Sequence, residues 1–185
     1  WGATIYAVTE LASLARAIRP AVLVLLWLLL AAAAVVLAVR RHRRSRARQA
    51  GRKPSKPGPD APERALPRLR AFLARPLGLL LALTLGLILG VTLLLTLAVA
   101  PNTWDAMTYH MSRVMHWQVN GHVDHYPSNI VRQLYMPPLP EYAILHFQVL
   151  SGGDRFANLV QWLCAAASLA GAAGMLIALV VAGIM

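Results

Sequence analysis

Three long apolar runs without a charged residue constrain the fold of this chain more than any other feature. They cover 20–39, 77–100 and 159–185. Each is at least as long as the roughly 20 helical residues that cross the hydrocarbon core of a bilayer. Helices satisfy their own backbone hydrogen bonds in lipid. The runs therefore predict an all-α membrane protein with several transmembrane helices.

The composition agrees with this prediction. Hydrophobic residues make up 58% of the chain and charged residues 14%, whereas a soluble domain carries roughly a quarter charged residues. Both ends of the sequence fall in apolar stretches, so we expect a fragment of a longer protein, with residues 1–15 as the end of a truncated first helix. Glu10 should lie near the membrane interface. The single cysteine, Cys164, rules out a disulfide framework and is expected to be a small buried hydrophobe.

These runs divide the chain into three parts: an N-terminal transmembrane region at 1–39, a basic linker at 40–75 and a core fragment at 76–185. The linker holds 13 of the 18 lysines and arginines. Its proline, serine and glycine content predicts disorder, and its positive charge predicts a cytoplasmic position. We expect it to meet anionic lipid headgroups and not nucleic acid.

Residues 101–157 then face the outside of the plasma (inner) membrane. Asn102 or Thr103 can cap a helix that runs to about Val119. Further on, Asn120-Gly121 predicts a turn, Pro137–Pro140 should break the chain, and 141–150 should form a short helix ended by Gly152-Gly153. Two faces are expected on the first helix: a polar one of Asp105, Thr108, Tyr109, Ser112 and His116, and an apolar one of Met107, Met111, Val114 and Met115.

Five of the six histidines lie in this outer loop. Imidazole is a common metal ligand, but the spacing of these histidines suits a shared metal poorly. We therefore predict no metal site and no cofactor, and keep a divalent metal as a minor alternative.

Asp105 has two interpretations from the residues alone. It can be structural, as a helix cap or a partner for Arg113, or it can be a catalyst. Glu141 follows the proline cluster and could pair with Arg132. The two interpretations of Asp105 carry equal weight at this point.

The loop resembles the first outer loop of GT-C glycosyltransferases, which include the protein O-mannosyltransferases and the aminoarabinose transferases of lipid A. The resemblance covers roughly 77–185. It rests on an acidic residue opening the loop, Asp105, on Tyr109 four positions later, and on Pro137-Pro138-Leu139 with the aromatic and aliphatic stretch after it. The longer stretch WDAMTYHMSRVMHW looks like a bacterial subgroup of that family.

This resemblance implies a membrane enzyme that moves a sugar from a polyprenyl-phosphate donor to an acceptor of unknown identity. It implies that Asp105 is the general base, which fits the need to deprotonate a hydroxyl nucleophile. The residues implied to bind substrate are Tyr109, His110, Arg113, Arg132, Tyr135, Pro137, Pro138 and Glu141. Of these, Arg113 or Arg132 would contact the donor phosphate.

One departure concerns the residue after Asp105. Many members of the family have a second acid there, whereas this chain has Ala106. The catalytic assignment therefore depends on Asp105 alone.

The alternative function is a non-enzymatic membrane protein, such as a transporter or an assembly subunit, whose polar loop binds a substrate or partner. Transporters typically have charged or broken helices at mid-bilayer. The three uncharged, continuous runs here favour the enzyme.

Overall fold

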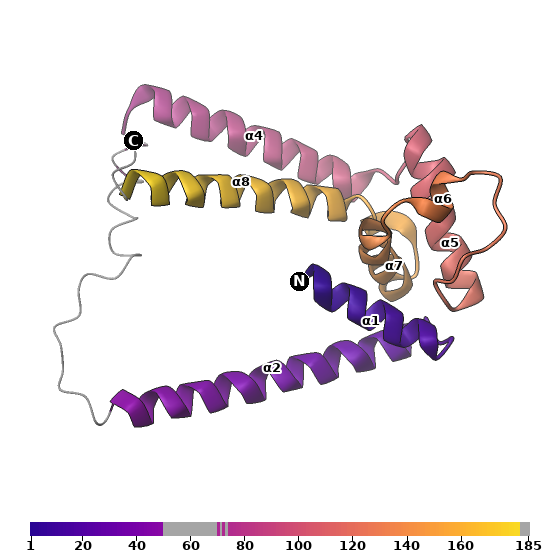
Figure 1. The fold of residues 1–185 in the computed structure, drawn as a ribbon. Coiled ribbons are helices and arrows are strands. Elements are labelled where there is room, and N and C mark those ends of the chain that lie inside the picture. The colour runs from indigo at the N-terminus through magenta and orange to yellow at the C-terminus, as the bar shows by residue number, and fades with distance from the viewer. Residues whose placement is uncertain (50–69, 71, 73, 182–185) are drawn as a thin grey trace. The chain divides into compact units, whose positions relative to one another are not determined.

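The computed structural model of the chain describes residues 1–49, 70, 72 and 74–181 (Figure 1). Every regular element within those residues is a helix, in agreement with the predicted fold class. The chain divides into two compact units. One comprises Trp1–Leu28 with Thr92–Met185, and the other comprises Leu29–Val91. The first unit contains the whole of the loop 101–157.

The apolar runs form α2 (Pro20–Gln49), α4 (Pro76–Ala98) and α8 (Leu159–Val181). All three are long and apolar enough to cross a membrane. Large apolar side chains such as Leu28 and Leu87 are exposed on them. A helix that is apolar all round needs an apolar environment. The chain is therefore a membrane protein with helical spans.

The structure corrects the predicted start of the basic linker. Helix α2 continues ten residues beyond the predicted end at Val39, through Arg40 to Gln49. Arginine, alanine and glutamine are good helix formers, and a helix that is already nucleated extends at little cost. The prediction of disorder from 50 onward falls almost wholly on 50–69, 71 and 73, which lie outside the described residues.

The remaining helices are short. Residues near the N-terminus form α1 (Gly2–Leu14). The loop contains a π-helix, η1 (Ala106–His110), followed without a break by α5 (Met111–Asn120). Next come α6 (Arg132–Tyr135), α7 (Leu139–Ser151) and the 3-10 turn η2 (Asp154–Phe156).

Fewer residues of the proline cluster lie outside a helix than predicted. Pro137 and Pro138 precede α7, whereas Leu139 and Pro140 belong to its first turn. Proline fits there because the first turn of a helix leaves its N–H groups unbonded. As predicted, α7 ends at glycine: Gly152 has a positive φ of 75°.

Helix α7 is the centre of the core in the first unit, where it packs against α1 and α5 (Figure 1). Its Leu145 is fully buried, together with Val8 of α1 and Val114 of α5. The start of α2 closes the cluster with Leu23, and Trp117 is its largest side chain. This core holds the loop helices against the N-terminal segment.

The predicted apolar face of the first loop helix was half wrong. Met111 and Val114 are buried, but Met107 and Met115 are 56% and 47% exposed. Trp117 takes the place of Met115 in the core. The buried apolar residues Met111, Val114 and Trp117 follow one another at spacings of three. Met107 lies before them, in the π-turn.

The prediction for Cys164 was also wrong, since this side chain is exposed on α8. The prediction assumed that an apolar run is packed within protein. A helix that faces lipid presents small apolar side chains outward instead.

Candidate functional site

The candidate site is built on the helix formed by η1 and α5, which contains a π-turn near its start. Oγ1 of Thr103 accepts a hydrogen bond from the backbone N–H of Ala106 at 3.2 Å, so Thr103 is the cap that the sequence predicted. The N–H of Met111 then bonds to the carbonyl of Ala106, five residues back. Single π-turns are rare and occur frequently at functional sites.

The π-turn determines which side chains share a face. A π-turn contains more residues than a regular turn, so Asp105 and His110, five positions apart, lie closer to one side of the helix than they would in an α-helix. Tyr109 adjoins them, with its ring centroid 4.0 Å from that of His110. In a regular α-helix His110 would be rotated away from Asp105.

Asp105 forms an ion pair with Arg132 of α6. Nη1 of Arg132 lies 3.0 Å from Oδ1 of Asp105, and the two side chains are 43% and 64% exposed. The guanidinium also lies 6.0 Å from the centre of the Tyr109 ring. The predicted pairing of Asp105 with Arg113 was therefore wrong. An exposed pair of this kind contributes little to stability, so both groups are free to exchange partners.

Glu141 lies on the buried side of the same cluster, in the first turn of α7. Its Oε1 lies 3.0 Å from Nδ1 of His110 and 3.7 Å from Nη1 of Arg113. The carboxylate is fully buried. The predicted pairing of Glu141 with Arg132 was wrong: Glu141 lies beside Arg113, and Arg132 pairs with Asp105.

Arg113 is held by two further groups. Its Nη1 donates to the carbonyl of Met136 at 2.8 Å. Its guanidinium lies 4.7 Å from the centre of the Trp117 ring. Because Arg113 is buried and carries a permanent charge, it offsets the charge of Glu141 inside the protein.

The environment shifts two pKa values in this cluster. Burial raises the pKa of Glu141, but the hydrogen bonds from His110 and from its own backbone, with the facing Tyr109, outweigh burial and leave that pKa below its usual value. Glu141 is therefore ionised at neutral pH. Burial, and then the charge of Glu141, raise the pKa of Tyr109 to about 12, so the phenol keeps its proton.

Two buried polar atoms of this cluster have no hydrogen-bond partner among the described residues: Oε2 of Glu141 and Nε of Arg113. Such atoms are few in native proteins and are found where function requires them.

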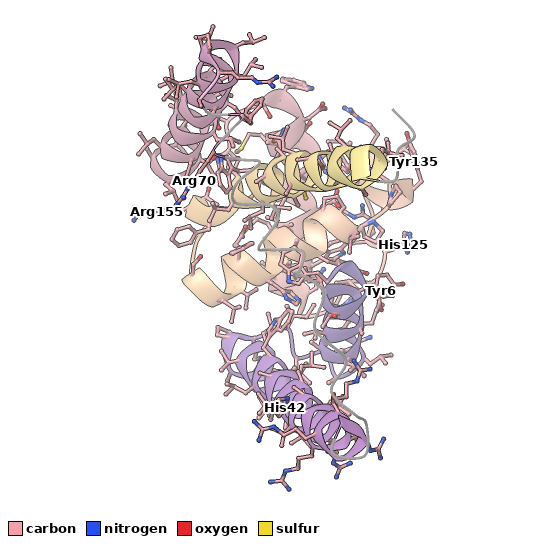
Figure 2. All side chains as sticks on the ribbon, turned by 90° about the vertical axis from the view of Figure 1, so that its left-hand side faces the viewer. Tyr6, His42, Arg70, His125, Tyr135 and Arg155 are labelled. Atoms are coloured by element: carbon pink, nitrogen blue, oxygen red, sulfur yellow. The ribbon has the colours of Figure 1, made fainter. Side chains whose placement is uncertain are left out.

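The other predicted substrate-binding residues occupy the margin of the cluster. Tyr135 is the last residue of α6 and is 64% exposed (Figure 2). Pro137 and Pro138 form the link from α6 to α7. This link fixes the carbonyl of Met136 that Arg113 contacts, so the prolines act on the site through the backbone.

Sequence reasoning missed Gln133, the residue that holds the site together. This side chain is 3% exposed. Its Nε2 donates to the carbonyl of Thr108 at 2.6 Å and to Oγ of Ser112 at 3.1 Å. Its Oε1 accepts from the hydroxyls of Tyr126 and Ser128. No feature of the sequence marks Gln133, because its partners are separated from it along the chain.

A second polar contact, also missed, joins α1 and α2 to α7. His146 is buried; its Nε2 lies 3.0 Å from Oγ1 of Thr9, and Nε1 of Trp27 donates to its Nδ1 at 3.2 Å. Thr9 gives its own proton to the carbonyl of Ile5, so Nε2 of His146 is the donor in their contact. Nearby, the hydroxyl of Tyr142 donates to Glu10 at 2.7 Å.

Within the part of the chain that the structure describes, no group of three or more histidine, cysteine or acidic side chains is placed to hold a metal ion. Comparison with known proteins found no family model, no curated protein and no solved structure that matches this chain. Its chemistry therefore has to be argued from the cluster itself. That cluster combines an exposed carboxylate, an exposed guanidinium and a half-buried imidazole, which suit proton transfer and anion binding.

Proposed function

We propose that this chain is part of a membrane glycosyltransferase of the GT-C type. It transfers a sugar from a polyprenyl-phosphate donor to an acceptor hydroxyl on the outer face of the membrane, with Asp105 as general base. The supporting observation is the convergence of Asp105, Tyr109, His110 and Arg132 on one exposed surface of the loop.

The position of the surface favours a lipid-linked substrate. Asp105 lies seven residues beyond the end of α4 at Ala98. Trp104, beside it, is 79% exposed, and exposed tryptophans are typical of membrane interfaces. A polyprenyl phosphate keeps its phosphate at that same level. The basic segment that begins at Arg40 favours the cytoplasmic side for the linker, which supports an outer position for this loop.

Arg132 is suited to the donor phosphate. Its guanidinium pairs with Asp105 at 3.0 Å and lies 6.0 Å from the centre of the Tyr109 ring. A phosphate offers two oxygens to the planar guanidinium, which is a stronger and more directional contact. Donor binding would then draw Arg132 away from Asp105 and leave the carboxylate free to take a proton.

Asp105 has to accept one proton in the proposed reaction. The acceptor oxygen forms its bond to the anomeric carbon, and the bond from that carbon to the donor phosphate breaks. The bonding electrons leave with the phosphate, and Asp105 takes the proton of the acceptor hydroxyl. Positioned general bases contribute about 10²–10⁴-fold in rate.

The test is Asp105→Asn in the full-length protein, with Asp124→Asn as the matched control because Asp124 is an equally exposed acid of the same loop. Membranes containing each variant receive radiolabelled polyprenyl-phosphate mannose, glucose or arabinose, and release of polyprenyl phosphate is measured. Asp105→Asn should lower release about 10²-fold or more with unchanged membrane insertion, and Asp124→Asn should have no effect. Normal release by Asp105→Asn would refute the proposal.

A further inference from the structure

The contact between His110 and Glu141 has the geometry of a carboxylate–imidazole dyad. Because Glu141 is ionised, it can only accept, and so Nδ1 of His110 is the donor in their 3.0 Å contact. A neutral imidazole carries one proton, which leaves Nε2 with its lone pair. The His110 side chain is 32% exposed while Glu141 is fully buried. The basic nitrogen therefore lies on the open side of the ring.

A second pair in the loop shows what distinguishes this dyad. Nδ1 of His122 lies 3.1 Å from Oδ2 of Asp124, but the Asp124 side chain is 66% exposed. Water competes with such a carboxylate for the imidazole. Glu141 is out of water, and its Oε2 has no hydrogen-bond partner within the described part of the chain. It can strengthen its interaction with His110 when that ring becomes positive.

The π-turn brings this dyad toward the side of the helix that holds the proposed base. Asp105 and His110 are five residues apart, and the extra residue in the turn sets them closer to one side than a regular α-helix would. Arg132, which pairs with Asp105, lies 6.0 Å from the centre of the Tyr109 ring. The ring of Tyr109 adjoins His110 on one side, and its phenol keeps its proton. The charged groups around the dyad are Arg113 beside Glu141 and Arg132 beside Asp105.

We infer that His110, oriented by Glu141, is a second proton-accepting group of this site, which receives on Nε2 the proton that Asp105 takes from the acceptor hydroxyl. The inference rests on the proposed function. In the full step, the acceptor oxygen bonds to the anomeric carbon and the phosphate leaves with its electron pair. The proton passes from the acceptor to Asp105 and then to His110, and the resulting imidazolium pairs with the Glu141 carboxylate.

The charges around each group favour this direction of transfer. A protonated Asp105 loses its electrostatic attraction to Arg132, so the proton is held weakly there. On His110 the new positive charge faces a buried carboxylate at 3.0 Å. Passing the proton on returns Asp105 to its ionised form, ready for the next acceptor. Glu141 acts through His110 and is a positioning residue.

The experiment measures polyprenyl phosphate release from radiolabelled polyprenyl-phosphate glucose by the full-length protein, at limiting and saturating donor. His110→Gln should lower kcat about 10²-fold and leave the KM for the donor unchanged. Glu141→Gln keeps an oxygen that can accept from Nδ1 but loses the charge, so kcat should fall less. His122→Gln is the matched control and should behave as wild type. Thermal unfolding of each purified variant reports on folding.

Added imidazole gives a readout that a structural role would not change. It should restore part of the kcat of His110→Ala, because free imidazole can occupy the space of the lost ring. Wild-type kcat in His110→Gln, or no rescue of a folded His110→Ala, would overturn the inference while an inactive Asp105→Asn still upholds the proposed function. If the wild-type protein releases no polyprenyl phosphate from the mannose, glucose or arabinose donor, both the inference and the proposed function are refuted.

Discussion

Asp105 and Glu141 are carboxylates of the same loop, and their surroundings give them opposite properties. Asp105 is mostly exposed beside a partly exposed partner, Arg132. Glu141 is fully buried between His110 and Arg113. An exposed carboxylate can meet a substrate, whereas a buried one can only act on its fixed neighbours. This difference divides the proposed roles between a base and a positioning residue.

Gln133 provides a test of the site as a folded structure. Gln133→Leu keeps the size of the side chain but removes four hydrogen bonds from a residue that is 3% exposed. Because the hydroxyl of Tyr126 and the carbonyl of Thr108 then lose a partner, we expect the free energy of unfolding to fall by about 2–3 kcal/mol. Val131→Ala, at a neighbouring exposed position, should change it by less than about 0.5 kcal/mol.

Unfolding of purified protein in detergent, followed by tryptophan fluorescence against denaturant, measures both values. Equal stability of Gln133→Leu and wild type would show that these hydrogen bonds are replaced by water in solution.

At the residue scale, the structure brings Asp105, His110, Arg113, Arg132 and Glu141 into one cluster. Their roles in catalysis and substrate binding stay predictions. Their pairing was predicted wrongly, because which arginine meets which acid depends on the packing of α6 and α7 on α5. Charge and spacing along one helix contain no information on that packing.

At the scale of elements, helix ends are fixed by local chemistry that a sequence reveals. Gly121 ends α5 and Gly152 ends α7, with positive φ values of 73° and 75°. The segment just before α8 contacts the C-terminal end of α4: Nε of Arg155 donates to the carbonyl of Leu97 and Nδ2 of Asn158 to that of Val99. Carbonyls at the end of a helix have no partner within it, so these contacts replace water.

The two glycines make a matched pair for a test. A Cβ at Gly121 would lie 3.0 Å from the backbone oxygen of Arg16, whereas a Cβ at Gly152 would meet nothing within 4 Å. Both alanine variants incur the cost of a left-handed backbone, about 1 kcal/mol. Gly121→Ala should lose roughly twice as much stability, because it also crowds the link between α1 and α2. Denaturant unfolding of both variants measures this, and equal losses would contradict it.

The π-turn is the element that the sequence could not predict. Thr103 and the helix to about Val119 follow from capping and periodicity. Nothing in AMTYH distinguishes a π-turn from a regular one. At the end of the turn, His110 contacts Glu141, which lies 31 residues away. Of the apolar face drawn from a period of 3.6, Met107 within the turn and Met115 beyond it were wrong.

For the whole molecule, the spans were predictable because each is defined by its own composition. A run such as 77–100 needs no tertiary partner to be recognised as a membrane helix. The assembly of the loop on α1 was not predictable, since it rests on contacts between residues more than 100 positions apart. The hydrogen bond from Tyr142 to Glu10 and the contact of His146 with Thr9 are of this kind.

His146 couples this assembly to pH, because its buried ring joins three helices. Burial lowers the pKa of His146 from 6.5 to about 4. The unfolded chain then binds the proton more readily, so the stabilising contribution is complete above pH 6.5 and is lost as the pH falls toward about 4. Glu141, whose pKa is also lowered, acts in the same direction at more acidic pH.

Thermal unfolding in detergent between pH 7.5 and 4 tests this coupling. The wild-type midpoint should fall as the pH drops below 6.5, the ordinary pKa of this side chain. His146→Gln can still bond to Thr9 and Trp27 but does not titrate. It should therefore be less stable than wild type at pH 7.5 and lose less stability on acidification. His42→Gln, at an exposed position on α2 (Figure 2), should keep the wild-type slope. An unchanged slope in His146→Gln would mean that another group causes the acid sensitivity, and that the junction of α1, α2 and α7 does not depend on a neutral imidazole.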